Sequence, residues 1–573
     1  MRPTQIRVKN FLSYEDSGEI DINNKTIIVG ENNAGKSNFV NAIRTFFRFS
    51  SRRRQDLNNF YNRNKNKKIN ITVWFDDLSE EEKEDFSEGL NEPSTGELAV
   101  RLISEYNSDD GRAETNDYQQ LVNNDSNKWE KKSGLANTLD NHLPDVAHYE
   151  AERELDDAAK TSNKSSLLFK LLGSAYDEIS EENKKDLEKG REELQKQLRK
   201  ETPTPIDELV GSLNEKMSNQ VKIDGELNIG FDIPGVREMV QRHATIWADN
   251  EEANEIADMG SGSRMSFLLS CIWETAERGE VAEDTLLTLE EPENYLHPHS
   301  VRQLGTTIDD LAGGDDFIFL TTHSPELASV RDISSIKRIS VSEGSSKVDY
   351  INKEFSEDKK EQLRTIASRK INELFFSRAV IVCEGSSDRD ALRIADELVA
   401  QTIPDRNPLD AEGVSVVDAG GKNNVPLYLN LADQFDIPCV SLLDDDNEDE
   451  DSKDVDKDTV NKCKALSDSF FRLEEDLERS LLKSISIDNF HDSMERLSEI
   501  GVVVEYDEDL AKMKKEVSEN PNTDRIDKKV SKYEHYDPPK PPFARQVARR
   551  ADVKSLPDKL QEVIKSSVRV SEE

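Results

Sequence analysis

One eight-residue segment constrains the fold of this chain more than any other feature of its sequence. Residues 30–37 read Gly-Glu-Asn-Asn-Ala-Gly-Lys-Ser, which fits the phosphate-binding P-loop pattern. An apolar strand is expected before it, at 26–29, and a helical pattern follows it. In that setting backbone N–H groups close around phosphates, Lys36 reaches the β and γ oxygens, and Ser37 ligates Mg²⁺. A chance glycine-rich turn would not explain the strand and the helix, so the segment predicts an α/β nucleotide-binding fold.

Two later strand ends carry groups that suit a nucleotide site. The apolar run 285–289 ends in Glu290-Glu291-Pro292-Glu293, where the ligands of open α/β sheets bind. We expect Glu290 to hold Mg²⁺, directly or through water, and Glu291 to orient or deprotonate the attacking water. A second apolar strand, 317–320, leads to His323, whose imidazole is expected at the γ-phosphate. Taken alone, His323 is more often an ordinary strand-end histidine.

A loop rich in glycine and serine, 259–264, precedes an apolar helix at 265–275 and can bind an anion. The order P-loop, Gly/Ser loop, acidic strand end and strand-end histidine resembles the ABC-type ATPases of the SMC-like kind. That resemblance implies two chains that sandwich two nucleotides. One departure is that Glu290 stands where the general pattern has Asp, which leaves the rate of ATP hydrolysis open. The residues expected to contact nucleotide are Gly30, Asn32, Asn33, Gly35, Lys36, Ser37, Asn38, Ser261, Gly262, Glu290 and His323.

A second set of strand-end groups lies in the C-terminal part of the chain. An apolar strand at 379–383 is followed by Glu384, Asp388 and a helical pattern, and another at 438–443 ends in three aspartates, 444–446. Between them the strand 414–417 leads to a glycine turn. Strand ends of one parallel sheet would bring carboxylates together, and such a cluster repels itself unless divalent cations neutralise it. The expected ligands are Glu384, Asp388, Asp444 and Asp446.

The pattern of Glu on one strand and Asp-x-Asp on a later strand resembles the TOPRIM domain of topoisomerases, primases and certain nucleases. The alternative is a solvated acidic loop at 444–454, but loop composition explains neither the apolar strand before it nor the Glu384-Gly385 turn. The register of the ligands stays open, because Asp445 could replace either neighbour.

Both motif sets on one chain resemble the OLD (overcoming lysogenization defect) family of nucleases, which includes the nuclease subunit of Gabija phage defence. Two further stretches carry this resemblance, 473–478 and 540–544. It implies that Lys540 stabilises the phosphate or the leaving group, although as bare sequence Lys540 is equally a solvated loop residue. Phosphodiester hydrolysis is served by two cations roughly 3.5 to 4 Å apart. The catalytic set is then Glu384, Asp388, Asp444, Asp446 and Lys540, with Glu291 for ATP hydrolysis.

The expected architecture is an ABC-type P-loop ATPase head with a helical insert, followed by a C-terminal TOPRIM α/β domain. The ATPase would occupy 1–154 and 236–365, the insert 155–235, and the TOPRIM nuclease domain 375–573. The resemblance assigns dimerisation to the insert, and a solvent-facing helical hairpin is the alternative. The insert is expected to hold a charged helix at 177–200 and a strand at 220–231, whereas 76–97 and 104–132 are expected to be rich in loops.

Charge is the feature that fits least well, since 76 basic and 117 acidic residues give a net charge of −41. A DNA polyanion is repelled by such a chain unless cations or local patches intervene. A salt-rich host cytoplasm is one hypothesis for the acidity. Basic clusters at 52–54 and 63–68 are candidates for a DNA track and equally for ordinary solvated loops.

The remaining composition indicates an intracellular protein. The four cysteines are scattered, and three lie in apolar runs, so we interpret them as buried thiols in a reducing compartment. The sequence contains no signal peptide and no apolar run of about 18 residues. We therefore expect a cytoplasmic location without membrane contact.

Together these features predict an ATP-regulated DNA endonuclease that uses ATP and Mg²⁺ or Mn²⁺ and acts as a homodimer or a higher homo-oligomer. A role in antiphage defence and a helicase partner are implied by the resemblance alone. One alternative is an ATP-switched DNA sensor or clamp that binds metal without cutting, and another is a DNA-repair nuclease. Sequence specificity and the direction of ATP control are left open.

Overall fold

The computed structural model describes residues 1–47, 57–86, 98–107, 112–123, 128–150, 167–201, 204–218, 233–244, 246–250, 252–277, 285–294, 296–313, 317–351, 355–366, 369–402, 406–444, 453–473, 477, 548–549 and 556–572. The chain divides into two compact units. Unit 1 comprises residues 1–143 and 319–573, and unit 2 comprises residues 144–318.

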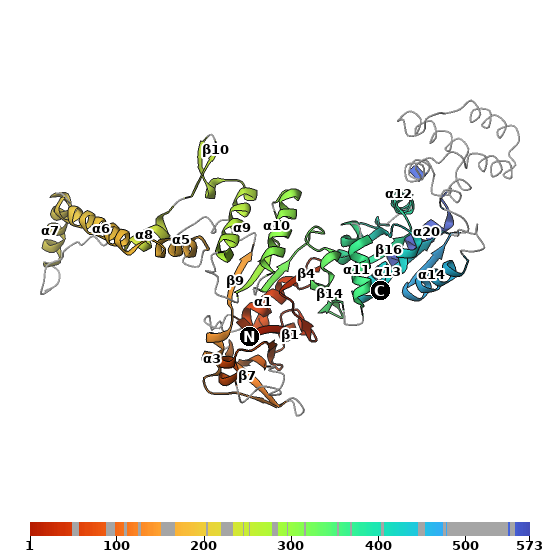
Figure 1. The fold of residues 1–573 in the computed structure, drawn as a ribbon, viewed down its shortest axis with the longest axis horizontal. Coiled ribbons are helices and arrows are strands. Elements are labelled where there is room, and N and C mark those ends of the chain that lie inside the picture. Colours follow the sequence, from red (N-terminus) through yellow and green to blue (C-terminus); the bar gives the residue numbers. More distant parts are fainter. Residues whose placement is uncertain are drawn as a thin grey trace. The chain divides into compact units, whose positions relative to one another are not determined.

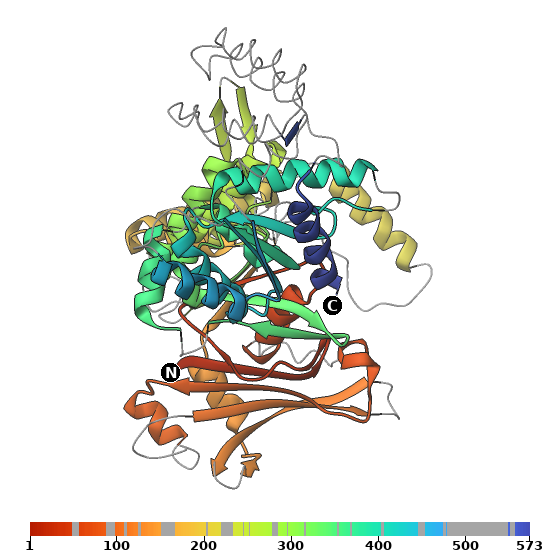
Figure 2. The same cartoon turned by 90° about the vertical axis from the view of Figure 1, so that its right-hand side faces the viewer.

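Unit 1 begins with an antiparallel sheet in the strand order β2-β1-β5-β6-β7-β8, with β3 paired to β1. One face of this sheet carries helix α1 (Lys36–Phe47), as Figure 2 shows. The Phe46 ring lies 5.5 Å from that of Tyr118 and 6.2 Å from that of Phe75, so aromatic packing fixes the helix that follows the P-loop. The strands are β1 (Arg2–Phe11), β2 (Tyr14–Asp16), β3 (Ile20–Asp21), β5 (Ile69–Asp76), β6 (Leu98–Asn107), β7 (Arg112–Asn123) and β8 (Lys128–Glu130).

The prediction that residues 104–132 are rich in loops is wrong. This segment contains the end of β6 and the whole of β7 and β8, which are paired with one another. Tyr118, Gln120 and Leu121 of β7 are buried, and the Gln120 amide donates to the carbonyl of Phe86 at 3.1 Å. Because a buried glutamine looks polar in the sequence, the apolar alternation that identifies a strand is hidden here.

A second group of strands in unit 1 holds the P-loop. β4 (Lys25–Gly30) lies between β14 (Ile336–Ser342) and β13 (Phe317–Thr321), and β15 (Ser345–Asp349) flanks β14. β14 runs parallel to β4, and Ile28 and Val29 are fully buried. β4 leads directly through the P-loop into α1 (Figure 1). The other helices of this part are α2 (Glu80–Asp85), α3 (Leu135–His142) and α11 (Glu357–Ile366).

The C-terminal part of unit 1 is the predicted α/β domain. Its four strands run parallel in the order β17-β16-β18-β19. Helices α12 and α20 share one buried core with the sheet, while α13 packs with α14 (Figure 2). The predicted fold class is therefore confirmed. The elements are β16 (Ala379–Cys383), α12 (Ser386–Thr402), β17 (Val414–Asp418), α13 (Val425–Gln434), β18 (Cys439–Leu443), α14 (Lys453–Leu466), β19 (Ser469–Arg472) and α20 (Asp558–Glu572).

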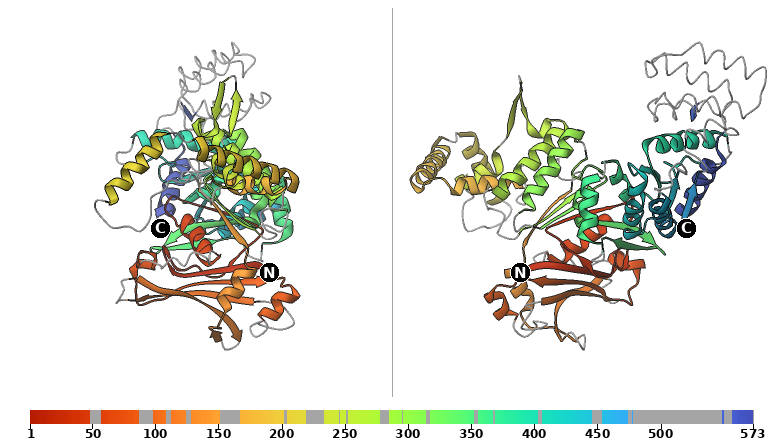
Figure 3. Two further views of the ribbon diagram at one scale, coloured as in Figure 1. Left: turned by 90° about the vertical axis from the view of Figure 1, so that its left-hand side faces the viewer. Right: turned by 45° about the vertical axis from the view of Figure 1, so that its right-hand side comes forward.

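Unit 2 combines a parallel strand pair with helices (Figure 3). β9 pairs in parallel with β12, and α9 contacts α10. The charged helix expected at 177–200 is α6, whereas the strand expected at 220–231 lies outside the described residues. The elements are β9 (Asp145–Glu150), α5 (Leu167–Asp177), α6 (Glu181–Glu201), α7 (Thr204–Ser218), α8 (Val236–His243), β10 (Trp247–Asn250), β11 (Glu252–Glu255), α9 (Ser261–Glu277), β12 (Thr285–Glu290) and α10 (Pro298–Leu311).

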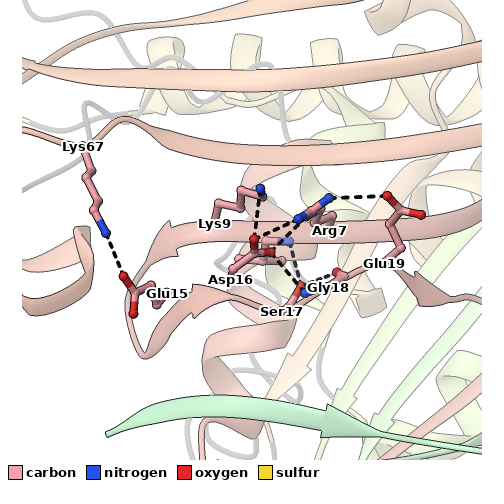
Figure 4. A network of polar contacts seen from close by, with 9 residues as sticks. Arg7, Lys9, Glu15, Asp16, Ser17, Gly18, Glu19 and Lys67 are labelled. Atoms are coloured by element: carbon pink, nitrogen blue, oxygen red, sulfur yellow. Dashed lines mark hydrogen bonds and ion pairs between the residues drawn. The ribbon is translucent and has the colours of Figure 1, made fainter. Parts of the chain in front are cut away.

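Basic side chains of the N-terminal sheet are paired with carboxylates (Figure 4). Arg7 donates to both oxygens of Asp16 at 2.9 Å, and Lys9 lies 2.9 Å from the same carboxylate. Partial burial alone would raise the pKa of Asp16, but the hydrogen bonds from Arg7 and Lys9 outweigh it and lower this pKa to about 2. In the basic cluster at 63–68, Lys67 pairs with Glu15 at 2.7 Å and Lys68 with Glu105. The cluster at 52–54 lies outside the described residues.

All four cysteines are free and buried, as predicted. Among the described helices, none is long and apolar enough to cross a membrane.

Candidate functional site

The two glycines of the P-loop are required by conformation and by close packing. Gly30 has a φ of +140°, and a Cβ at this position would collide with the Ile339 carbonyl of β14. Gly35 has a φ of +112°, and its Cβ would collide with the Ser346 hydroxyl. Only glycine combines these φ values with such close neighbours, so the loop is held against strands β14 and β15.

Residues far from the motif hold the P-loop in place. The buried Tyr14 hydroxyl donates to the Gly35 carbonyl at 3.0 Å, and the Ser346 hydroxyl donates to the Ala34 carbonyl at 2.6 Å. Asn38, predicted to contact nucleotide, donates its amide to the Ser13 hydroxyl at 2.9 Å. None of these residues carries a sequence signal for this role: the Ser346 contact joins segments 312 residues apart, and Tyr14 and Ser13 lie outside the motif.

Lys36 is buried, and its ammonium folds back onto the loop. Its Nζ donates to the carbonyls of Gly30 at 3.2 Å and Glu31 at 2.9 Å. Asn32 and Ser37 are exposed at the mouth of the loop. The arrangement of backbone N–H groups, a lysine and the start of α1 suits a polyphosphate.

A cavity of about 400 Å³ opens beside the first three residues of the P-loop. Its walls come from the P-loop, from His323 after β13, and from the segments around β16 and β17. The Thr322 N–H donates to the Ile28 carbonyl at 3.1 Å, which fixes the end of β13 against β4. His323 therefore lies beside the P-loop, as its position in the sequence predicts. The cavity is lined by Gly30, Glu31, Asn32, His323, Phe376, Arg378, Asp410, Ala411 and Gly413.

Unit 2 holds the predicted acidic strand end. Glu290 is buried at the end of β12, and its Oε1 lies 3.7 Å from Nε2 of His148 on β9. The His148 Nδ1 lies 2.9 Å from the Thr288 hydroxyl, so this histidine bridges the two strands. Glu291 has a φ of +48°, and its carboxylate accepts a hydrogen bond from the Asn294 amide at 3.0 Å. Sequence reasoning missed His148, because parallel pairing across 140 residues is what brings it to Glu290.

The predicted Gly/Ser loop also lies in unit 2, at the start of α9. Ser261 is the first residue of the helix, and Gly262 follows it. The N–H groups of Ser263 and Arg264 donate to the Gly260 carbonyl at 3.0 and 3.2 Å. The segment therefore stands at a helix N-terminus as predicted, but the helix begins at Ser261 rather than at 265, so residues 261–264 are its first turn and not a loop.

Three of the acidic residues predicted in the C-terminal domain, Glu384, Asp388 and Asp444, follow strand ends at one edge of its parallel sheet. β16 ends next to Glu384 and β18 ends next to Asp444, and the Asp444 N–H donates to Oε1 of Glu384 at 2.7 Å. Asp388 lies in the first turn of α12, where its Oδ2 accepts the Gly385 N–H at 2.8 Å. One hydrogen bond thus joins the ends of β16 and β18, and another joins the turn after β16 to α12. Asp446, Lys540 and residues 474–476 and 478 lie outside the described residues.

Two basic side chains to which the sequence assigned no role, Lys422 and Arg389, lie at the same edge. The glycine turn after β17 places the Gly421 N–H on the Glu384 carbonyl at 2.8 Å. Lys422, the next residue, donates its ammonium to the Asp444 carbonyl at 3.0 Å. Arg389 pairs with Asp418 at the end of β17. The signal that could have found Lys422 is its position directly after a double glycine at a strand end.

Two cysteines lie behind this carboxylate edge and stay protonated. Burial, followed by the nearby carboxylates of Asp388 and Asp418, raises the pKa of Cys383 well above its ordinary value. Burial and the charge of Glu384 raise the pKa of Cys463 to about 12. Because only a thiolate is an effective nucleophile, neither thiol suits covalent catalysis.

The donor set at this edge suits a hard divalent cation, because carboxylate oxygens are the ligands that such cations prefer. Glu384 and Asp388 each engage a backbone N–H through one oxygen. Within the described ranges, no three acidic, histidine or cysteine side chains form a group arranged to hold a metal. The described positions of Glu384, Asp388 and Asp444 therefore do not form a three-ligand group, and Asp446 stays a prediction.

Two segments of the chain match known family models. Residues 1–328 match the family model described as AAA ATPase domain, and residues 375–446 match the overcoming lysogenization defect protein-like TOPRIM domain. The Old nuclease of Escherichia phage P2 is 24% identical, over 68% of this chain and 69% of the relative. Endonuclease GajA of Bacillus cereus is 24% identical, over 68% of this chain and 66% of the relative.

Among solved structures, an Smc head bound to the C-terminal winged-helix domain of ScpA aligns with a TM-score of 0.37 and 16% identity. The alignment covers 62% of this chain and 98% of that one.

Proposed function

This chain belongs to the OLD family of ATP-dependent nucleases, with an AAA ATPase domain followed by a TOPRIM domain, and from that premise we propose that it cuts DNA as an ATP-regulated endonuclease that requires Mg²⁺ or Mn²⁺. The observation that carries this proposal is that two neighbouring parallel strands, β16 and β18, end side by side, where the backbone N–H of Asp444 donates to the carboxylate of Glu384. Asp388 follows in the first turn of α12. Such an edge is where α/β proteins bind ligands.

In this proposal Glu384, Asp388, Asp444 and Asp446 hold the divalent cations. When bound, these cations neutralise charge on the attacking and leaving oxygens of the phosphodiester. Asp388 keeps α12 in register with the strand end through its bond to the Gly385 N–H. Lys422 fixes the Asp444 backbone, and Lys540 stabilises the phosphate or the leaving group.

ATP is proposed to bind at the P-loop, with Lys36 on its phosphates, Ser37 and Glu290 toward its metal ion, and His323 toward its terminal phosphate. The cavity beside Gly30 and His323 supports this placement. Glu291 is proposed to orient the attacking water, and Ser261 and Gly262 to contact the nucleotide of a second chain. That assignment requires a homodimer or a higher homo-oligomer.

The domain limits, the partners and the biological role are part of the same proposal. The ATPase parts are 1–154 and 236–365, the insert that dimerises is 155–235, and the nuclease domain is 375–573. The name of the GajA relative supports endonuclease activity, and antiphage defence follows from the Gabija resemblance. A helicase partner is proposed on the same ground.

The test is cleavage of supercoiled plasmid by the native chain and by Glu384→Ala, with Mg²⁺ or Mn²⁺, at several salt concentrations. We expect metal-dependent nicking or cutting by the native chain and none by the variant. Asp418→Asn is a less disruptive comparison, because Asp418 pairs with Arg389 rather than with the predicted ligands. Intact DNA in every lane, from protein that is folded and binds ATP, would instead favour the metal-binding DNA sensor.

A further inference from the structure

An arginine of the nuclease domain reaches the P-loop. Arg378 directly precedes β16, and its guanidinium donates from Nε and Nη2 to the two carboxylate oxygens of Glu31, both at 3.0 Å. Glu31 is the second residue of the P-loop. The side chain of Arg378 is 55% exposed, so it can move without breaking a packed core.

The backbone that carries this arginine is fixed to both domains. The Arg378 N–H donates to the Gly413 carbonyl at 2.8 Å, within the nuclease domain. The buried Arg338 of β14 donates to the carbonyl of Ser377, the preceding residue, at 2.8 Å and to that of Phe435 at 3.2 Å. Arg378 therefore has a backbone held by hydrogen bonds and an exposed side chain.

The same arginine lines the cavity beside the P-loop, together with Gly30, Asn32 and His323. The carboxylates of Glu31 and Asp410 also line it. A nucleotide cradled by the P-loop would direct its terminal phosphate toward this space. The planar guanidinium binds phosphate through two parallel hydrogen bonds, which suits it to this position better than lysine.

Glu31 accepts hydrogen bonds from the two basic side chains that a phosphate would attract, Arg378 and Lys36. Its carboxylate holds Arg378, and its carbonyl accepts from Lys36 at 2.9 Å. Because the Arg378–Glu31 pair is exposed, solvent screens it and it is weak. A triphosphate carries more charge than one carboxylate and can displace it.

We propose that Arg378 is a nucleotide-binding residue that the nuclease domain supplies to the ATP site, exchanging Glu31 for the terminal phosphate when a triphosphate binds. This inference rests on the proposed function and adds a residue of the nuclease domain to its nucleotide site. β16 runs from Ala379 to Cys383, is completely buried, and ends next to Glu384. The strand that presents the terminal-phosphate contact at one end thus presents a metal ligand at the other.

The test compares binding of ATPγS and of ADP to the full chain, with Arg378→Ala, Arg378→Lys and Glu31→Gln variants. Arg378→Ala should lower the affinity for ATPγS about tenfold, because one charge-assisted contact is lost. It should change the affinity for ADP less than twofold. Arg378→Lys should fall between. Glu31→Gln removes the competing carboxylate, so it should raise the affinity for ATPγS. The double variant Glu31→Gln with Arg378→Ala should not show this gain.

Lys347→Ala is the matched control. Lys347 is also at the domain junction, pairs with Asp436 at 2.6 Å, and does not line the cavity, so its loss should leave both affinities unchanged. Native-like binding of both nucleotides by Arg378→Ala, or equal weakening of both, would overturn the proposal. If the native chain itself neither binds nucleotide nor cuts DNA, the proposed function fails and not this contact alone.

Discussion

The P-loop and the carboxylate edge of the nuclease domain share one local design but suit ligands of opposite charge. In each, a buried parallel strand, β4 or β16, ends at a turn with glycine and leads into a helix. At the P-loop, the start of α1 is left to backbone N–H groups and Lys36, which favour an anion. At the other edge, Asp388 occupies the start of α12 by accepting the Gly385 N–H.

The difference shows that a strand–turn–helix unit determines where a ligand binds, while a few side chains determine its charge. A carboxylate bonded to the helix N-terminus neutralises the positive end of the helix dipole, so that this edge does not attract phosphate directly. Glu384 and Asp444 then add negative charge that requires cations. The two sites should accordingly respond to separate mutations.

Glu291→Gln is expected to give the largest difference between the effects of one mutation on ATP hydrolysis and on DNA cleavage. If Glu291 serves as base or water-orienting group, ATP hydrolysis should fall by about 10² to 10⁴, as for the loss of a general base. ATP binding and nucleotide-free DNA cleavage should stay near native values. Glu293→Gln, in the same turn, is the control and should retain ATPase activity. Steady-state phosphate release measures this, and normal turnover by Glu291→Gln would remove Glu291 from the ATP site.

The glycine turns of the two sites should differ in sensitivity. In Gly30→Ala the new Cβ would collide with the Ile339 carbonyl, and the backbone φ of +140° is strained for alanine. Together these should lower the free energy of unfolding by about 2–4 kcal/mol. Gly420, at the other edge, has a φ of +68° with nothing within 4 Å of a Cβ, so Gly420→Ala should cost only about 1–2 kcal/mol. Urea unfolding followed by circular dichroism compares them. Equal costs would contradict the packing argument.

Lys422→Ala tests whether the nuclease edge needs a cation of its own. Losing its bond to the Asp444 carbonyl should slow cleavage about tenfold at saturating metal, the value of one hydrogen bond from a charged donor. The metal concentration for half-maximal cleavage should not rise, because a positive charge has been removed from a cation site. Lys422→Arg should restore part of the rate, and Lys462→Ala, on the exposed side of α14, should have no effect. An unchanged rate in Lys422→Ala would restrict the residue to local packing.

The smallest effect concerns acid stability of the N-terminal sheet. The folded pKa of Asp16 is about 2, below its ordinary 3.8, so ionised Asp16 stabilises the fold above about pH 4 and this stabilisation is lost as pH falls toward 2. Asp16→Asn should therefore lower stability slightly at pH 7 and flatten its decline between pH 4 and 2. Thermal unfolding across that range is the measurement. Identical pH profiles for the two proteins would show that Arg7 and Lys9 do not stabilise the charged form.

Much of the two sites could be predicted because their motifs are local. The P-loop, and the strand ends at Glu384 and Asp444, need only a short apolar run and the residues after it. The supports could not be predicted in this way. Ser346 holds the P-loop, and His148 contacts Glu290, through contacts between distant segments, while Tyr14 holds the P-loop from a strand outside the motif. The antiparallel sheet was also missed in part, since Gln120 is buried through a hydrogen bond that its polarity conceals.

The central claim is that one chain carries two separable sites, and comparing Lys36→Ala with Glu384→Ala tests it most directly. For each variant and the native chain, ATP binding is measured by calorimetry. Cleavage of plasmid is then measured with Mg²⁺ or Mn²⁺, in the presence and in the absence of ATP. Lys36→Ala should lower the affinity for ATP about a hundredfold, and this variant should still cut DNA without nucleotide. Glu384→Ala should bind ATP with native affinity and should not cut DNA. Cleavage that persists in Glu384→Ala, or the loss of both activities in a folded Lys36→Ala protein, would contradict the account.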